Sequence, residues 1–252
     1  MRVASRHAVV TGGGSGIGAA IAEALVAAGT TVSILGRGES QLAETAGRLN
    51  CAYQVADVSE PEAVRIAFEA IAERHGDVDV LVNNAGNAEA RPFAKTDDAH
   101  WHSMIGVNLH GVYYCTRAVV PAMLAAGYGR IVNVASTAGV KGYSYVSAYC
   151  AAKHGVIGLT RALAAEFAKS NITVNAVCPG YARTALVDRS VDKIVAATGR
   201  SRDEALAELV KSNPQGRLIE PEEVAAAVIW LLDEHTSSIT GQAIAVAGGE
   251  IT

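Results

Sequence analysis

Short apolar runs alternate along the chain with longer segments in which apolar residues recur at helical spacing. A run of roughly four to eight mostly apolar residues between polar or glycine-rich segments is typical of a buried strand. Such runs predict strands at 8–11, 31–35, 52–55, 80–83, 130–135, 173–177 and 242–246. The intervening pattern predicts helices at 16–28, 40–49, 61–75, 98–126, 146–169 and 221–234.

Strands that alternate with helices and carry apolar residues on both faces form a parallel sheet covered by helices on both sides. We therefore expect an α/β fold, a Rossmann-type doubly wound parallel sheet of about seven strands. No Pro/Ser-rich or charged linker divides the chain, so residues 1–252 are expected to form a single domain. The irregular stretch 181–218 contains a helix-forming run at 201–210 and is expected to form a lid; the alternative is a surface excursion without a role.

The chain has 252 residues, a formal net charge of -4 and 18% charged residues. Its positive charges do not gather into runs, so no nucleic-acid partner is expected. Four widely separated cysteines suit a protein with reduced thiols. The N-terminal segment lacks the apolar core of a signal peptide, and no stretch reaches the roughly 18 apolar residues of a membrane helix. We expect a cytoplasmic protein with no membrane partner.

A glycine-rich segment, Thr11-Gly-Gly-Gly-Ser-Gly-Ile-Gly18, directly follows the first predicted strand. A strand that runs through glycines into a helix directs free backbone N–H groups and the positive end of the helix dipole toward a pyrophosphate. Side chains at the glycines would obstruct the turn, the diphosphate or the contact between helix and sheet. The predicted dinucleotide contacts in this turn are Gly12, Gly14, Ser15, Gly16, Ile17 and Gly18.

The end of the second predicted strand distinguishes NAD from NADP, because an acidic residue there would accept hydrogen bonds from the ribose 2'-hydroxyl of NAD. This chain has Gly36-Arg37 at that place. Arg37 can offer a fork of donors to a 2'-phosphate, so NADP(H) is the preferred cofactor and NAD(H) stays possible. The alternative interpretation is that Arg37 lies in solvent at the strand end.

Tyr149 and Lys153 are one helical turn apart, so both side chains project from one face of a helix and can act on one bound molecule. A tyrosine with an unperturbed pKa of about 10 is a poor acid near neutrality. A nearby lysine ammonium favours the phenolate and is expected to lower the pKa of Tyr149, which predicts that this tyrosine acts as a general acid.

The chain resembles the short-chain dehydrogenase/reductases from end to end. The resemblance rests on Thr11-Gly-x-x-x-Gly-x-Gly18, Asn83-Asn84-Ala85-Gly86, Asn108, Ser136, Tyr149-x-x-x-Lys153, Pro179-Gly180 and Thr184. It implies an NAD(P)-dependent oxidoreductase acting on a carbonyl or secondary alcohol. It also implies a catalytic tetrad of Asn108, Ser136, Tyr149 and Lys153, and assembly as a homotetramer.

The same resemblance implies roles for the remaining cofactor contacts. Asp57 and Val58 would contact the adenine, and Lys153 would bind the nicotinamide ribose, with Tyr149 beside it. The other implied contacts are Asn84, Ala85 and Gly86 on the adenosine and ribose side, and Pro179, Gly180, Ala182 and Thr184 near the nicotinamide. Many NADPH-using relatives carry a second basic residue at the position of Ser15. This chain therefore offers a 2'-phosphate one basic residue, Arg37, instead of two.

The chain is similar to the β-ketoacyl reductase and 3-hydroxyacyl-CoA dehydrogenase branch, so the expected substrate is a β-ketoacyl thioester or a similar ketone. The predicted substrate contacts are Ser136, Val140, Tyr143, Tyr145, Tyr149, Tyr181 and Leu186. Carrier-protein reductases of this branch use two basic residues for docking, whereas this chain has Gly127 and Ser170. This favours a CoA thioester, a free β-keto ester or another small ketone over a carrier-bound chain.

Two other functions stay open at this point. The first is an NAD-dependent secondary-alcohol or 3-hydroxyacyl-CoA dehydrogenase. The second is a nucleotide-binding sensor or scaffold without turnover, because a fold alone does not prove activity. A metal site is not expected, because His100-x-His102 has neither the i, i+4 spacing of helical ligands nor a third ligand nearby.

Overall fold

The computed structural model describes residues 6–251. The N-terminal segment 1–5 and Thr252 lie outside the described residues, so the prediction that the N-terminus is no signal peptide falls partly outside them. Seven parallel strands form one sheet in the order β3-β2-β1-β4-β5-β6-β7. They are β1 (His7–Thr11), β2 (Thr31–Gly36), β3 (Ala52–Val55), β4 (Val80–Asn83), β5 (Gly129–Val134), β6 (Ile172–Pro179) and β7 (Ala243–Val246). The predicted α/β fold with a doubly wound parallel sheet is confirmed.

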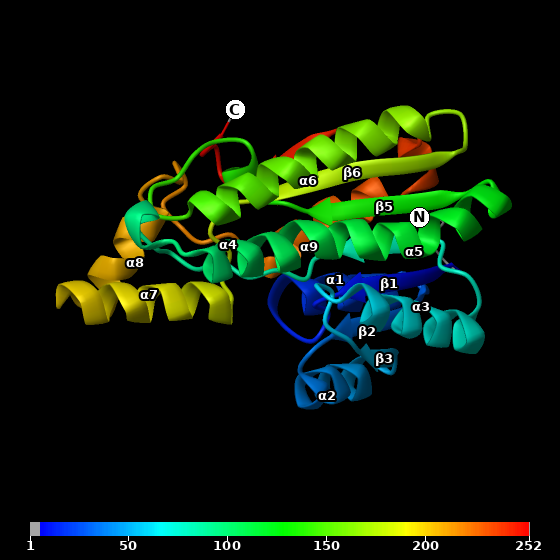
Figure 1. Cartoon of the computed structure of the whole chain (residues 1–252), viewed down its shortest axis with the longest axis horizontal. Coiled ribbons are helices and arrows are strands. Elements are labelled where there is room, and N and C mark those ends of the chain that lie inside the picture. Colours follow the sequence, from blue (N-terminus) through cyan, green and yellow to red (C-terminus); the bar gives the residue numbers. More distant parts are fainter. Residues whose placement is uncertain (1–5, 252) are drawn as a thin grey trace.

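Helices cover both faces of this sheet (Figure 1). They are α1 (Gly16–Ala27), α2 (Glu39–Leu49), α3 (Pro61–His75), α4 (Asp98–Ile105), α5 (Gly111–Ala126), α6 (Ser147–Glu166), α7 (Ala185–Thr198), α8 (Arg202–Val210) and α9 (Pro221–Leu231). Successive β1 residues serve opposite faces: Val10 packs in the core with α1, α2 and α9, and Val9 in the core with α3 and α5. This alternation explains why the strands are apolar throughout.

The strand order reverses between β1 and β4, which are direct neighbours in register Ala8↔Val80 to Val10↔Val82. In an open parallel sheet, the helices after two such strands leave toward opposite faces and a crevice opens beyond the carboxyl ends of the strands. The glycine-rich turn follows β1 and the Asn84 segment follows β4, so both lie at this crevice.

The predicted element boundaries differ from the structure in two instructive places. The helix predicted over 98–126 is interrupted by a π-helical turn, η2 (Gly106–His110), which separates α4 from α5. The stretch 181–218, predicted as irregular apart from one helical run, contains two helices, α7 and α8. Figure 1 shows these two helices together at one end of the molecule, away from the helices that cover the sheet.

Within residues 6–251, no helix combines the length and the apolar character that crossing a membrane requires.

Candidate active site

The glycine-rich turn joins β1 to α1 and leaves the first turn of α1 open to an anion. Ser15 is the N-cap residue, yet no described side chain caps the helix, and its first turn contains no acidic residue. The free N–H groups at a helix start carry partial positive charge and are suited to a phosphate. Thr45 Oγ1 donates a 3.0 Å hydrogen bond to Gly14 O and so holds the turn from α2.

Asn84 fastens this turn to the end of β4. Its Nδ2 donates to Thr11 O at 2.9 Å and to Gly12 O at 3.3 Å, while Thr11 Oγ1 accepts from the backbone N–H groups of Asn84 and Ala85. Gly18, in the first turn of α1, packs directly against the backbone of this turn, and a Cβ placed on it would lie 2.2 Å from Gly12 O. The turn therefore has the close backbone packing that a dinucleotide site needs.

Replacing Gly18 with alanine is expected to abolish NADPH binding and to destabilise the fold by about 1–3 kcal/mol, because the new methyl group would overlap a backbone carbonyl. Gly47→Ala is the matched control, since its Cβ would meet nothing within 4 Å and alanine favours the helix by roughly 0.5–1 kcal/mol. Urea unfolding and NADPH fluorescence titration measure both effects. Tight NADPH binding by the Gly18→Ala protein would contradict this account of the turn.

Arg37 and Asp57 meet at the ends of β2 and β3. Arg37 Nη1 lies 3.5 Å from Asp57 Oδ2, and the Arg37 side chain is 71% exposed. Burial alone would raise the pKa of Asp57, but hydrogen bonds from the Ser59 hydroxyl and backbone N–H, together with Arg37, lower it below its ordinary value. Asp57 is thus ionised at neutral pH, and the Arg37 side chain is largely exposed although its guanidinium pairs with Asp57.

A cleft with a volume of about 570 Å³ opens beside this pair. Its lining includes three aromatic or imidazole side chains that sequence reasoning did not select, namely Trp101, His102 and His110. They come from α4 and η2, whose amphipathic pattern gave no sign that these side chains would face a cleft. Val58, predicted as an adenine contact, is buried and packs against Gly111.

The segment after β6 lies over the glycine-rich turn. A Cβ placed on Gly16 would be 3.0 Å from Thr184 Cγ2, so Thr184, the N-cap of α7, touches the start of α1. Ala182 pairs with Ile219 in a parallel bridge, which holds the segment in place. Pro179 ends β6 and Gly180 follows it at the same edge of the sheet. The predicted nicotinamide segment and the predicted pyrophosphate turn are therefore in contact.

Asn108 lies at the centre of the π-helical turn and is completely buried. Its Nδ2 donates to Asn87 O at 2.8 Å and to Met104 O at 3.0 Å, and its Oδ1 accepts from Asn87 N at 3.2 Å. An asparagine amide inserted among helix carbonyls disturbs the regular ladder, which explains why the predicted continuous helix is interrupted here.

Gly86, Asn108 and Lys153 converge. A Cβ on Gly86 would lie 2.8 Å from Asn108 Oδ1 and 3.7 Å from Lys153 Nζ. Lys153 is buried in α6, its Nζ donates to Val134 O at 2.8 Å, and it lies 5.7 Å from the centroid of the Tyr149 ring. The structure thus brings the predicted lysine, asparagine and tyrosine to one place beyond β4 and β5.

Ser136 completes this group at the end of β5. Its Oγ accepts from Ala138 N at 3.1 Å and caps the short turn η3 (Thr137–Gly139). Tyr149 is half-buried, and burial raises its pKa to about 12, with a hydrogen bond from Ser136 opposing the rise. Ser136 and Tyr149 can therefore direct two hydroxyl groups at one ligand atom.

The pKa of Tyr149 is raised overall in this structure, whereas the sequence predicted that Lys153 would lower it, so the predicted direction is wrong here. The physical reason is burial, which raises the pKa of Tyr149 and lowers that of Lys153 to about 8. At neutral pH both groups keep their protons. A protonated tyrosine beside a lysine ammonium is the form needed to give a proton to a carbonyl oxygen.

Known proteins of similar sequence point to one family. The family model described as short chain dehydrogenase matches residues 6–195. The chain belongs to this family. It is 40% identical over 249 residues to the granaticin polyketide synthase putative ketoacyl reductase 1 of Streptomyces violaceoruber, which covers 96% of this chain and 92% of that protein.

This short-chain dehydrogenase is also 40% identical over 247 residues to the acetoacetyl-CoA reductase of Rhizobium meliloti, covering 98% of each chain. Among solved structures, an actinorhodin polyketide ketoreductase variant with NADPH matches with a TM-score of 0.94 and 39% identity, over 98% of this chain and 97% of that one. The predicted family and the prediction of an NAD(P)-dependent oxidoreductase acting on CH–OH groups are confirmed.

The predicted substrate contacts of this short-chain dehydrogenase fall into two groups. Tyr143 and Tyr181 lie near the tetrad, since the charge of an ionised Tyr181 would raise the pKa of both Tyr149 and Tyr143. Val140 and Tyr145 are 49% and 64% exposed. Leu186 is half-buried at the start of α7. Sequence reasoning missed Glu250, whose buried carboxylate accepts a hydrogen bond from Tyr143, because an isolated glutamate near a chain end carries no pattern.

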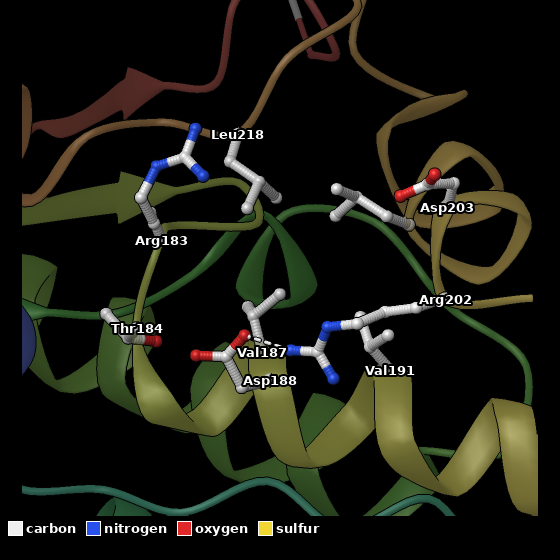
Figure 2. A pocket seen from close by; sticks show the side chains of 9 residues that line it. Arg183, Thr184, Val187, Asp188, Val191, Arg202, Asp203 and Leu218 are labelled. Carbon is white, nitrogen blue, oxygen red and sulfur yellow. Dashed lines mark hydrogen bonds and ion pairs between the residues drawn. The ribbon is translucent and has the colours of Figure 1, made fainter.

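The segment predicted as a lid has a small core of its own. Figure 2 shows Arg202 of α8 pointing at α7, where it pairs with Asp188 at 2.6 Å. Arg202 also forms an ion pair with Asp192 of α7. The cavity of about 160 Å³ beside this pair is lined mainly by side chains of the two helices and by none of the four predicted catalytic residues. This cavity belongs to the packing between α7 and α8.

Among the described residues, no group of three or more His, Cys, Asp or Glu side chains is arranged to hold a metal ion. His100 is buried, with its Nδ1 3.9 Å from Glu89, and His102 faces the 570 Å³ cleft.

Proposed function

We propose that this chain is an NADP(H)-preferring reductase of a β-ketoacyl thioester or a similar ketone, with Tyr149 as general acid. The observation that carries the proposal is the convergence of Asn108, Ser136, Tyr149 and Lys153 at the same edge of the sheet as the uncapped start of α1. The printed names of the relatives, ketoacyl reductase and acetoacetyl-CoA reductase, support the substrate class. The NADPH in the actinorhodin ketoreductase structure supports the cofactor.

The proposed reduction needs a hydride for the carbonyl carbon and a proton for the carbonyl oxygen. A bound reduced nicotinamide supplies the hydride for the carbonyl carbon. Tyr149 gives its proton to the oxygen on which negative charge develops, and the Ser136 hydroxyl donates a hydrogen bond to the same atom. Both donors gain strength as the charge grows, so they favour the transition state over the ground state.

Lys153 and Asn108 supply the proton that the reaction consumes and do not bind the carbonyl oxygen themselves. Lys153 holds the nicotinamide ribose with its ammonium and replaces the proton that Tyr149 gives up. Both amide protons of Asn108 are already donated within the chain and its oxygen accepts from Asn87 N, so only the second lone pair of that oxygen is left to accept from a water. Such a water connects Lys153 to solvent.

The proposal is tested by initial rates of NADPH and NADH oxidation with acetoacetyl-CoA, a β-keto ester, an aryl ketone and a cyclic ketone. NADPH-dependent reduction of the thioester or keto ester supports it. Activity confined to NADH would instead indicate a secondary-alcohol or 3-hydroxyacyl-CoA dehydrogenase. Cofactor binding without oxidation by any ketone would indicate a nucleotide-binding sensor or scaffold.

Arg37→Ala is expected to raise the KM for NADPH by about 10- to 100-fold and that for NADH by less than about threefold, because in this proposal the guanidinium binds the 2'-phosphate, which NADH lacks. Arg48→Ala is the matched control, since Arg48 forms an exposed ion pair with Glu23 on the neighbouring helix. Steady-state kinetics with both cofactors measure the ratio. Equal increases for NADPH and NADH would exclude a 2'-phosphate site at Arg37.

We further propose a cytoplasmic homotetramer of single-domain chains that pair through α5 and α6, each with segment 181–218 as the lid. Exposed Ala151 and Gly158 on α6 and exposed Tyr113 and Leu124 on α5 support this arrangement. Gly155, the other glycine of α6, packs against Leu109 of its own chain. Light scattering after gel filtration tests the mass, and Gly158→Arg is expected to lower it.

A further inference from the structure

Glu250 places a carboxylate inside the protein at the edge of the sheet where the tetrad lies. It follows β7, and its side chain is 1% exposed. A Cβ placed on Gly180 would lie 3.1 Å from Glu250 Oε2, so the carboxylate touches the segment predicted to contact the nicotinamide. A buried carboxylate is costly unless hydrogen bonds and an opposite charge compensate it.

Two side chains of the segment between β5 and α6 provide this compensation. Lys141 Nζ lies 3.0 Å from Glu250 Oε1, and the Tyr143 hydroxyl forms a short hydrogen bond with the same oxygen. The Lys141 ammonium also lies 4.9 Å from the centroid of the Tyr143 ring. Glu250, Lys141 and Tyr143 therefore form one charge-assisted cluster.

The cluster continues to the residue next to Ser136. Tyr143 Oη lies 2.7 Å from Thr137 Oγ1. A tyrosine hydroxyl has one proton, so Tyr143 donates it to the carboxylate and accepts from the Thr137 hydroxyl. Burial and the hydrogen bond to Glu250 raise the pKa of Tyr143, which keeps this proton in place. A chain of hydrogen bonds thus runs from Glu250 through Tyr143 to the turn that Ser136 caps.

We propose that Glu250 is a positioning residue for ketone binding: by holding Tyr143 and Lys141, it fixes the wall of the substrate site and the turn that presents Ser136 to the carbonyl oxygen. The inference rests on the proposed ketone reductase function. Glu250 itself does not touch the reacting atoms in this role. It acts through Tyr143, which was predicted as a substrate contact. Tyr143 lies close enough to Tyr181, another predicted substrate contact, for the charge of an ionised Tyr181 to raise its pKa.

The test compares Glu250→Gln, Tyr143→Phe and the double variant, with Glu222→Gln on the exposed start of α9 as the matched control. Glutamine keeps the shape but removes the charge that holds Lys141 and Tyr143, and phenylalanine removes only the hydroxyl. Each single variant is expected to raise the ketone KM by about tenfold and to leave NADPH affinity within about twofold. The double variant is expected to be no worse than either single one, because both break the same connection.

A purely structural role for Glu250 predicts a different result. In that case Glu250→Gln lowers the melting temperature and Tyr143→Phe leaves the ketone KM unchanged. That outcome overturns the inference, as do unchanged ketone KM values in both single variants or additive effects in the double one. A wild-type protein that reduces no ketone would instead refute the proposed function itself, so the two failures are distinguishable.

Discussion

Replacing Tyr149 with phenylalanine is expected to lower kcat by about 10³-fold while NADPH affinity stays within about twofold. The burial that raises the pKa of Tyr149 to about 12 keeps its hydroxyl protonated across the working range, so the group acts as a proton donor. Phenylalanine keeps the ring and its packing but has no proton to give. The developing alkoxide would then have only the Ser136 hydroxyl as a partner, which stabilises charge but does not complete the reduction.

Single-turnover measurements with preloaded NADPH separate this loss from product release. Tyr113→Phe is the control, because Tyr113 is 44% exposed on α5 and removing its hydroxyl should not change kcat. A second control is fluorescence titration, which checks that the Tyr149→Phe protein still binds NADPH. Near-wild-type turnover by Tyr149→Phe would show that another group supplies the proton, and the assignment of the general acid would be wrong.

The sequence predicted the fold well because its local signals agree with one another. Apolar runs such as 80–83 are bounded by turn residues, and Pro61 and Pro221 stand at the first positions of helices as expected. The glycine-rich turn was found in sequence because its function requires particular residues in one short segment. Tyr149 and Lys153 were found for the same reason, since one helical turn fixes their relation.

Features that depend on distant contacts were missed. The π-helical turn at Asn108 depends on hydrogen bonds with Asn87, a loop residue 21 positions away. The pairing of Glu250 with Tyr143 joins residues 107 positions apart. The pKa of Tyr149 was predicted in the wrong direction because a sequence shows the neighbouring lysine but not the burial that outweighs it. Local periodicity carries no information about such contacts.

Replacing Lys153 with methionine is expected to make the protein more stable and much less active. The pKa of Lys153 falls from 10.5 to about 8 on burial, which corresponds to a cost of roughly 3 kcal/mol for keeping the ammonium inside the fold. Methionine has a similar length and no charge. It leaves Val134 O without its 2.8 Å hydrogen bond, an offsetting loss of about 1–2 kcal/mol. The net gain at pH 7 is about 1–2 kcal/mol.

The same substitution should lower kcat/KM by about 10²- to 10³-fold and weaken NADPH binding, because it removes both the ribose contact and the group that replaces the tyrosine proton. A residue that costs stability and is needed for turnover is expected at a catalytic site. Lys169→Met, at an exposed position after α6, is the control and should change neither property.

The pH dependence of the stability gain provides a sharper test. The folded wild-type protein loses the Lys153 proton near pH 8, whereas the unfolded chain keeps it up to about pH 10.5. Between these values the unfolded state binds more protons, so the wild-type protein gains stability as the pH rises and the cost of the buried ammonium disappears. The advantage of methionine should therefore be largest below pH 8, vanish between pH 8 and pH 10, and be replaced at pH 10 by the cost of the lost hydrogen bond to Val134 O. Urea unfolding of both proteins at pH 7 and pH 10 measures this difference, and an advantage that is absent at pH 7 or grows with pH would show that Lys153 is not a buried cation.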